Sequence, residues 1–317
     1  MMRFLIDITI FVHKTNSPTI LLNMKLRISL VFLLSAFLSI GLHAQTETLE
    51  KQIAEYAKGK KATIGVAVLT DRSETIQYNN ELHFPLLSVF KFHIALAVLD
   101  KMDKAGISLE DTLFIKASQM FPNTYSPLRQ KFPDQDFTIS LGELLKYSIA
   151  QSDNNACDIL IDYAGGMKHI QRYIQRLGIL NCQLIDTEAE IHATNNHRRN
   201  WSQPSEVTRL LQIAVEKSLF APQYKNFLLQ TMIETQTGAD KLKASLPTDV
   251  TIGHKTGSSD RDATGMKVAD NDAGFITLPD GRRYYIAVFV TDSYETDKDN
   301  AAIIATISKM VYEAISL

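Results

Sequence analysis

Ser88-Val89-Phe90-Lys91 opens an apolar stretch that runs to Met102, and the rest of the chain can be organised around it. If this stretch is helical, the Ser88 hydroxyl and the Lys91 amine lie three residues apart on one face and can meet. A serine attacks poorly unless a base takes its proton, and a lysine is a base only when burial or a nearby cation lowers its pKa. Alone the pattern is weak, because a buried helix with a capping serine and a snorkelling lysine has the same letters.

The composition is that of an ordinary globular protein, with 45% hydrophobic and 21% charged residues in 317. A formal net charge of -2 gives no overall field for nucleic acid or an acidic membrane, so we expect a small-molecule substrate. The histidines show no His-Glu-x-x-His spacing, and Cys157 and Cys182 form no metal-binding pattern, so we expect neither metal nor cofactor. These two cysteines are either paired or two separate buried thiols.

Residues 1–44 predict an upstream extension followed by an export signal. Lys25 and Arg27 precede an uncharged apolar run, Ile28 to Ile40, and small residues favour cleavage after Ala44. The run is shorter than the roughly 20 residues that span a bilayer, which favours a cleaved signal over a membrane anchor. We therefore expect a periplasmic monomer with no membrane span after cleavage.

Strand patterns lie near both ends of the mature chain, and helical patterns lie between them. We expect strands at 62–70, 75–78, 251–255, 273–278 and 284–291, and helices at 48–58, 88–102, 141–150, 155–163 and 300–315. This order predicts an α+β fold: an antiparallel sheet built from both termini, flanked by helices, with an inserted all-helical domain. The sheet domain would comprise 45–85 and 236–317, the helical domain 86–235, and a cleft between them is the natural site.

Three further short patterns fall on loops or element ends. Ser152-Asp153-Asn154 separates two expected helices, Lys255-Thr256-Gly257 ends a strand, and Glu188 lies in the irregular polar segment 184–201. Each has an ordinary explanation: a helix cap, a strand entering a turn, and a solvated loop acid. Their order along the chain is more informative than any one of them.

Ser-x-x-Lys, Ser-Asp-Asn, a loop glutamate and Lys-Thr-Gly, in this order, resemble the motif set of class A serine β-lactamases. Penicillin-binding proteins share all of it except the glutamate. The resemblance covers essentially the whole mature chain and implies the β-lactamase/DD-peptidase-like fold. It implies a secreted enzyme that hydrolyses the β-lactam amide of penicillins or cephalosporins and so confers antibiotic resistance.

The resemblance also implies a role for each motif residue. Ser88 resembles the nucleophile, and Lys91 the residue that accepts or relays its proton. Ser152 is similar to the serine that passes a proton to the leaving nitrogen, and Glu188 to the glutamate that activates water for deacylation. Whether Lys91 or Glu188 is the acylation base stays open.

Other residues resemble the family's substrate contacts. Asn154 is similar to the residue that orients the substrate's side-chain amide, and Lys255 and Thr256 to the pair that receives its carboxylate. The N–H groups of Ser88 and Ser258 would form the oxyanion hole. A second ammonium at Lys255 would also help keep the first lysine neutral.

The loop around the glutamate departs from the usual Glu-Pro-x-x-Asn, since this chain has Glu188-Ala189-Glu190-Ile191-His192. It resembles the PER-type extended-spectrum branch, which favours cephalosporins as substrates. Without proline a cis peptide would cost about 3 kcal/mol, so we expect a trans bond and a differently folded loop. His192 is a candidate for holding the deacylating water, or a loop histidine bonded to backbone.

The strand after Lys-Thr-Gly carries no arginine for the substrate carboxylate at 271–274. Lys241, in a stretch that resembles the one from which other members supply this cation, is the candidate, the alternative being a solvated surface lysine. Two other functions use the same acylating residues: a penicillin-binding DD-peptidase, and a β-lactam sensor that stays acylated.

Overall fold

The computed structural model describes residues 48–316, and the predicted extension and export signal at 1–44 lie outside them. A helix at 48–57 begins the described part of the chain. None of the helices between residues 48 and 316 is long and apolar enough to cross a membrane.

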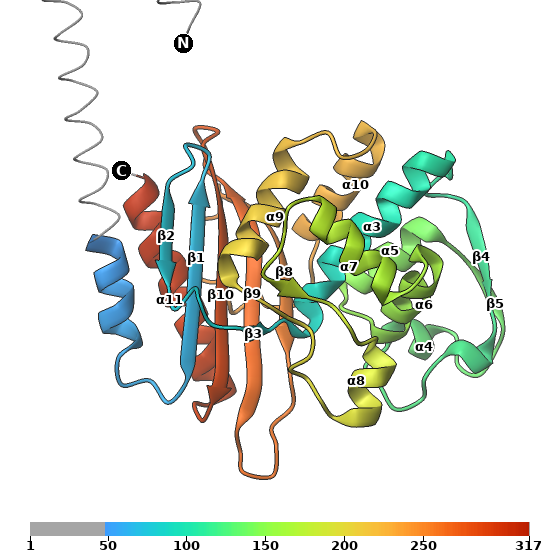
Figure 1. Cartoon of the computed structure of the whole chain (residues 1–317), viewed down its shortest axis with the longest axis horizontal. Helices are drawn as coiled ribbons and strands as arrows, with labels where there is room; N and C mark the ends of the chain where they lie inside the picture. Colours follow the sequence, from blue (N-terminus) through green and yellow to red (C-terminus); the bar gives the residue numbers. More distant parts are fainter. Residues whose placement is uncertain (1–47, 317) are drawn as a thin grey trace, which may run out of the picture. The chain divides into compact units, whose positions relative to one another are not determined.

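One five-stranded antiparallel sheet, in the order β2-β1-β10-β9-β8, is built from both ends of the described chain (Figure 1). Strand β1 pairs directly with β10, so segments more than two hundred residues apart share one sheet. This confirms the predicted α+β fold. The strands are β1 Thr63–Thr70, β2 Thr75–Tyr78, β8 Thr251–Ser258, β9 Lys267–Thr277 and β10 Arg283–Ser293.

Both faces of the sheet are covered. Alternate strand residues point to opposite sides, so each strand contributes apolar side chains to both faces. In β10, Ile286 and Val288 pack in one apolar cluster with the helix at 48–57 and with α11 (Asp297–Ser316). Ala287 and Phe289 pack in a second cluster with the helices from the middle of the chain. Each cluster fills one face of the sheet with buried aliphatic and aromatic side chains.

The middle of the chain is mainly helical. Its helices are α3 Phe90–Ala105, α4 Pro127–Lys131, α5 Leu141–Ala150, α6 Asn154–Ala164, α7 Met167–Arg176, α8 Glu188–Thr194, α9 Pro204–Glu216 and α10 Pro222–Ile233. Two small sheets join them: β3 Phe84–Pro85 with β7 Trp201–Ser202 and β6 Cys182–Gln183, and β4 Thr112–Ile115 with β5 Phe137–Ser140. The division into a sheet domain and a helical domain stays a prediction.

Two expected elements differ most from the observed ones. Strand β9 starts at Lys267 rather than at 273, because its first half carries buried charged residues instead of an apolar alternation. The segment expected to be irregular contains α8, which begins with a capping box between Thr187 and Glu190. The serine of Ser-x-x-Lys lies in a 3₁₀ turn, Leu87–Val89, just before α3.

Asp153 fixes the loop between α5 and α6. It is fully buried and caps α6 by accepting from the Ala156 N–H at 2.8 Å. Its carboxylate also accepts from the Ser126 hydroxyl at 2.9 and 3.0 Å and from the Leu128 N–H at 2.6 Å. One carboxylate therefore links the start of α4 to the start of α6. Ser152 and Asn154, which flank Asp153 in the sequence, are held in place by these bonds.

Asp153→Ala should lower the free energy of unfolding by about 3 kcal/mol, since the cap is lost and buried donors are left without an acceptor. Ser140→Ala is the matched control. Ser140 caps α5 through a single bond to the Glu143 N–H at 3.2 Å, so its loss should cost about 1 kcal/mol. Denaturant unfolding measures both; equal losses for the two variants would contradict the role given to Asp153.

Candidate active site

The Lys91 ammonium is fully buried and lies at the centre of the predicted site. Its Nζ donates to Ser88 Oγ at 3.0 Å, to the Ser152 carbonyl at 2.8 Å and to Asn154 Oδ1 at 2.5 Å. Glu188 Oε1 lies 2.8 Å from the same nitrogen. The structure thus brings five predicted residues to one point, although they come from the 3₁₀ turn before α3, α3, the loop before α6, α6 itself and α8.

The turn that carries Ser88 is held in an unusual conformation. Leu87 has a φ of 47°, which is uncommon for a residue with a side chain. Strand β8 lies so close that a Cβ at Gly257 would be 2.6 Å from the Leu86 carbonyl and 3.1 Å from the Ser88 nitrogen. Asn271, buried on β9, donates to the Pro85 carbonyl at 2.7 Å. Glycine at the Lys-Thr-Gly position is therefore required by close approach.

Lys255 lies on the other side of Ser152. Its buried Nζ donates to Ser152 Oγ at 2.9 Å and to the Thr256 carbonyl at 2.8 Å. Burial, and to a lesser extent the charge of Lys91, hold the pKa of Lys255 well below its usual value. Ser152 itself has a φ of 59°, so its carbonyl faces one lysine while its hydroxyl accepts from the other.

Asp158 anchors the first two residues of α8, and no motif in the sequence indicated it. Its two carboxylate oxygens accept from the N–H groups of Glu188 and Ala189, each at 2.8 Å. The Glu188–Ala189 bond is trans, as expected, like every peptide bond between residues 48 and 316. Burial raises the pKa of Asp158 to about 7. Its position four residues after Asn154, on the same face of α6, was the available signal.

A cleft of about 520 Å³ opens over Ser88. Of the predicted residues, Asn154, Glu188, His192 and Ser258 also line it. Its wall includes residues that no motif indicated: Asn123, Thr124, Tyr125, His197, Ser259 and Asp260. Thr124 accepts from Asn154 Nδ2 at 2.7 Å, and the Tyr125 side chain is exposed at the rim.

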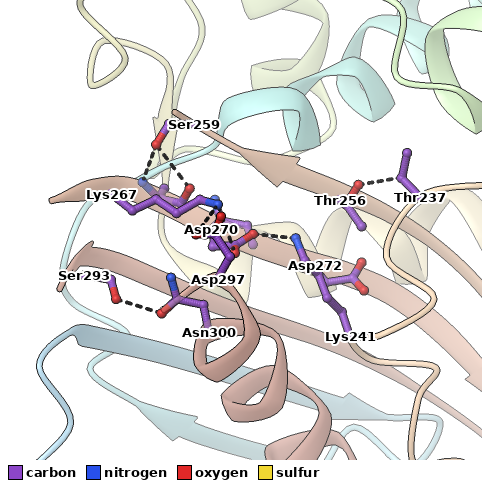
Figure 2. Close-up of polar contacts among 12 residues, drawn as sticks. Thr237, Lys241, Thr256, Ser259, Lys267, Asp270, Asp272, Ser293, Asp297 and Asn300 are labelled. Atoms are coloured by element: carbon purple, nitrogen blue, oxygen red, sulfur yellow. Dashed lines mark hydrogen bonds and ion pairs between the residues drawn. The ribbon is translucent and has the colours of Figure 1, made fainter. Parts of the chain in front are cut away.

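The end of β8 lies beside the segment after α10. The hydroxyls of Thr256 and Thr237 are 2.6 Å apart. Lys241 is buried rather than solvated, and it forms an ion pair with Asp270 of β9 (Figure 2). The solvated-surface alternative for Lys241 is therefore wrong, and its role toward substrate stays a prediction.

Neither cysteine joins the site as a ligand or a disulfide. Cys157 and Cys182 are both free and buried, which matches the alternative of two separate thiols. Burial raises the pKa of Cys182 to about 12, so this thiol stays protonated near neutral pH. Across residues 48–316 no group of three or more His, Cys, Asp or Glu side chains could hold a metal ion.

Comparison with known proteins agrees with this geometry. The β-lactamase enzyme family matches residues 48–315. A β-lactamase of Bacteroides uniformis is 61% identical over 91% of this chain and 98% of its own. The extended-spectrum β-lactamase PER-1 of Pseudomonas aeruginosa is 36% identical over 89% of this chain and 92% of its own.

Solved structures show the same likeness. The crystal structure of a class A β-lactamase from Bacteroides cellulosilyticus DSM 14838 is 60% identical and covers 86% of this chain and 98% of its own, with a TM-score of 0.84. The family match extends over nearly all of the described residues, and so does the fold. The chain therefore belongs to the class A β-lactamases, close to their extended-spectrum branch.

Proposed function

We propose that this β-lactamase opens the β-lactam ring through an acyl-enzyme on Ser88 and releases the product with water activated by Glu188. The observation that supports this most directly is the position of Lys91. Its Nζ lies 3.0 Å from Ser88 Oγ and 2.8 Å from Glu188 Oε1, so this one amine connects the nucleophile with the Glu188 carboxylate. A proton can pass between them without a large movement.

In acylation, Ser88 Oγ bonds to the β-lactam carbonyl carbon and its proton leaves toward Lys91 or Glu188. The N–H groups of Ser88 and Ser258 hold the developing oxyanion, where each donor contributes about 3 kcal/mol. The ring C–N bond then breaks, and the nitrogen takes a proton from Ser152 Oγ. Lys255, 2.9 Å from that hydroxyl, replaces the lost proton.

In deacylation, water attacks the ester carbon while Glu188 takes its proton. The C–Oγ bond breaks, the product leaves as a carboxylic acid, and Ser88 regains its hydrogen. His192 lines the cleft beside the glutamate and would help to hold this water. Asp158 sets the position of the glutamate through the two backbone bonds at the start of α8.

The substrate carboxylate would bind at the end of β8. Lys255 and Thr256 offer an ammonium and a hydroxyl there, and Lys241 adds a second cation, which suits the carboxylate that penicillins and cephalosporins carry. Asn154 would orient the substrate's side-chain amide. PER-1 is described as an extended-spectrum enzyme, and we infer that cephalosporins as well as penicillins are hydrolysed here.

We also infer export to the periplasm, with cleavage after Ala44, from the charged and apolar pattern at 25–44. Sequencing the amino terminus of the exported protein should find Gln45 first. A protein that keeps residues 28–40 would contradict cleavage.

Glu188→Gln should lower kcat by on the order of 10³-fold, because the water loses its general base while Ser88 still acylates. With a chromogenic cephalosporin, the parent should turn over continuously. The variant should carry a lasting acyl adduct in its intact mass. Parent-like turnover by the variant would contradict the role of Glu188.

Glu190→Gln is the matched control for this experiment. Glu190 lies two residues away and accepts from the Thr187 N–H at 2.9 Å, a bond that glutamine can also accept, so kcat should stay at the parent value. A parent that gives one stoichiometric burst and stays acylated would instead indicate a DD-peptidase or sensor, and no adduct on either protein would contradict Ser88 as nucleophile.

Asp158→Asn should change how stability depends on pH. The carboxyl has a pKa of 3.8 in its ordinary environment and about 7 in the fold. Between these values the folded state keeps a proton that the unfolded chain releases, so this group's contribution is complete below about pH 4 and is lost as pH rises through 7. The parent should therefore lose roughly 4 kcal/mol relative to the variant over this range.

Unfolding of both proteins at several pH values from 4 to 8 measures this difference. Asp162→Asn is the control, because Asp162 is an exposed carboxylate on the same helix and its removal should leave the pH dependence as in the parent. Parallel curves for the parent and Asp158→Asn would show that the carboxyl does not titrate in this range.

A further inference from the structure

The Lys241 ammonium contacts a carboxylate, and the lysine is buried. Only 10% of its side chain is exposed, and Asp270, its ion-pair partner, is 3% exposed. Figure 2 shows the lysine reaching from the segment after α10 to β9, where the two groups meet. A buried ammonium needs an oxygen partner in place of water, so the carboxylate is what holds this side chain in place.

Asp270 does not serve Lys241 alone. Its second oxygen lies 3.4 Å from the Nζ of Lys267, which is also 3.1 Å from Asp297. Asp297 in turn lies 2.6 Å from the guanidinium of Arg261. Because two lysines share the one buried carboxylate, its negative charge does not cancel the positive charge of both.

The pair lies beside the residues that would receive the substrate carboxylate. In the β8–β9 register Asp270 is opposite Ser258, and Thr256 is two residues away on the same face of β8. The Lys241 side chain and the Thr256 methyl group both pack around Gly238, at 3.5 and 2.4 Å from the position of a Cβ there. The Lys241–Asp270 ion pair is therefore located at the end of β8.

We propose that Asp270 is a positioning residue for substrate recognition: shared between Lys241 and Lys267, it holds the Lys241 ammonium in the position from which it can bind the substrate carboxylate. The proposal rests on the carboxylate-binding role proposed above for Lys241. A purely structural ion pair, joining the segment after α10 to β9, is the competing explanation. The two explanations predict different KM values for the double variant, in which both Lys241 and Asp270 are replaced.

The experiment compares Lys241→Ala, Asp270→Asn and the double variant, with kcat and KM for a cephalosporin and for its methyl ester. Each single change should raise KM for the free acid about tenfold, equivalent to about 1.4 kcal/mol, with kcat within about twofold. Since Asp270 acts through Lys241, the double variant should show the KM of Lys241→Ala alone. The ester, which has no carboxylate, should show no change in kcat/KM.

Two controls guard against loss of folding. Asp280→Asn removes an equal charge from the exposed β9–β10 turn and should keep the parent KM. Asp270→Glu keeps the charge and should recover most of the affinity that Asp270→Asn loses. If Asp270→Asn does not fold, Lys267→Met is the second variant. It leaves Asp270 paired with Lys241 alone, so the two charges of this pair balance, and it should raise KM for the free acid about threefold.

Several outcomes would overturn the proposal. These are a lower or unchanged KM in Asp270→Asn, multiplied effects in the double variant, or an equal loss for acid and ester. If Lys241→Ala itself leaves KM unchanged, the proposed function of Lys241 fails, and this inference fails with it. If Lys241→Ala raises KM and Asp270→Asn does not, only the inference about Asp270 fails.

Discussion

Two buried lysines, Lys91 and Lys255, set the constraint on which the rest of the structure depends. Both side chains are buried and their like charges repel, so each ammonium needs oxygen atoms supplied by the protein. Ser152 serves both, with its carbonyl toward one lysine and its hydroxyl toward the other. Asn154 and Glu188 complete the shell around Lys91. Two of these groups, the Ser152 hydroxyl and the Glu188 carboxylate, also move protons in the proposed reaction.

The sheet delivers Lys255 to this point through its register. Lys255 is opposite Ala273 on β9, while Asp272, opposite Thr256, accepts from His254 Nδ1 at 2.9 Å on the other face. A slip by one residue would exchange the two faces and remove the lysine from the site. Gly257 then lets β8 approach the turn of the nucleophile closely. The pairing of β8 with β9 therefore fixes the position of the Lys255 charge.

Much of the fold was predictable because its signals are local. The glycine stops, caps and β-branched alternations placed the helices at 141–150 and 155–163 and the first hairpin within one residue or so of their observed ends. The motif residues were predictable for a similar reason, since each chemical step needs a particular side chain. Strand β9 was predicted too short because Lys267 and Asp270 are buried as an ion pair and Asp272 is buried with a hydrogen bond to His254, and no rule of apolar periodicity indicates that.

The carboxylates that support the site lie outside the four motifs, and their partners are distant in the sequence. Asp158 binds backbone 30 residues further along the chain, and Asp270 pairs with a lysine 29 residues before it. Asp270 is buried and Asp158 is partly buried, and each holds one group that the sequence predicts for the site, Lys241 in the first case and Glu188 in the second. A change at either position would leave all four motifs intact and still move a catalytic or binding group. Two enzymes with the same motifs can therefore differ in substrate preference through residues that touch no substrate, which is why the motifs identify the reaction and the supporting contacts tune it.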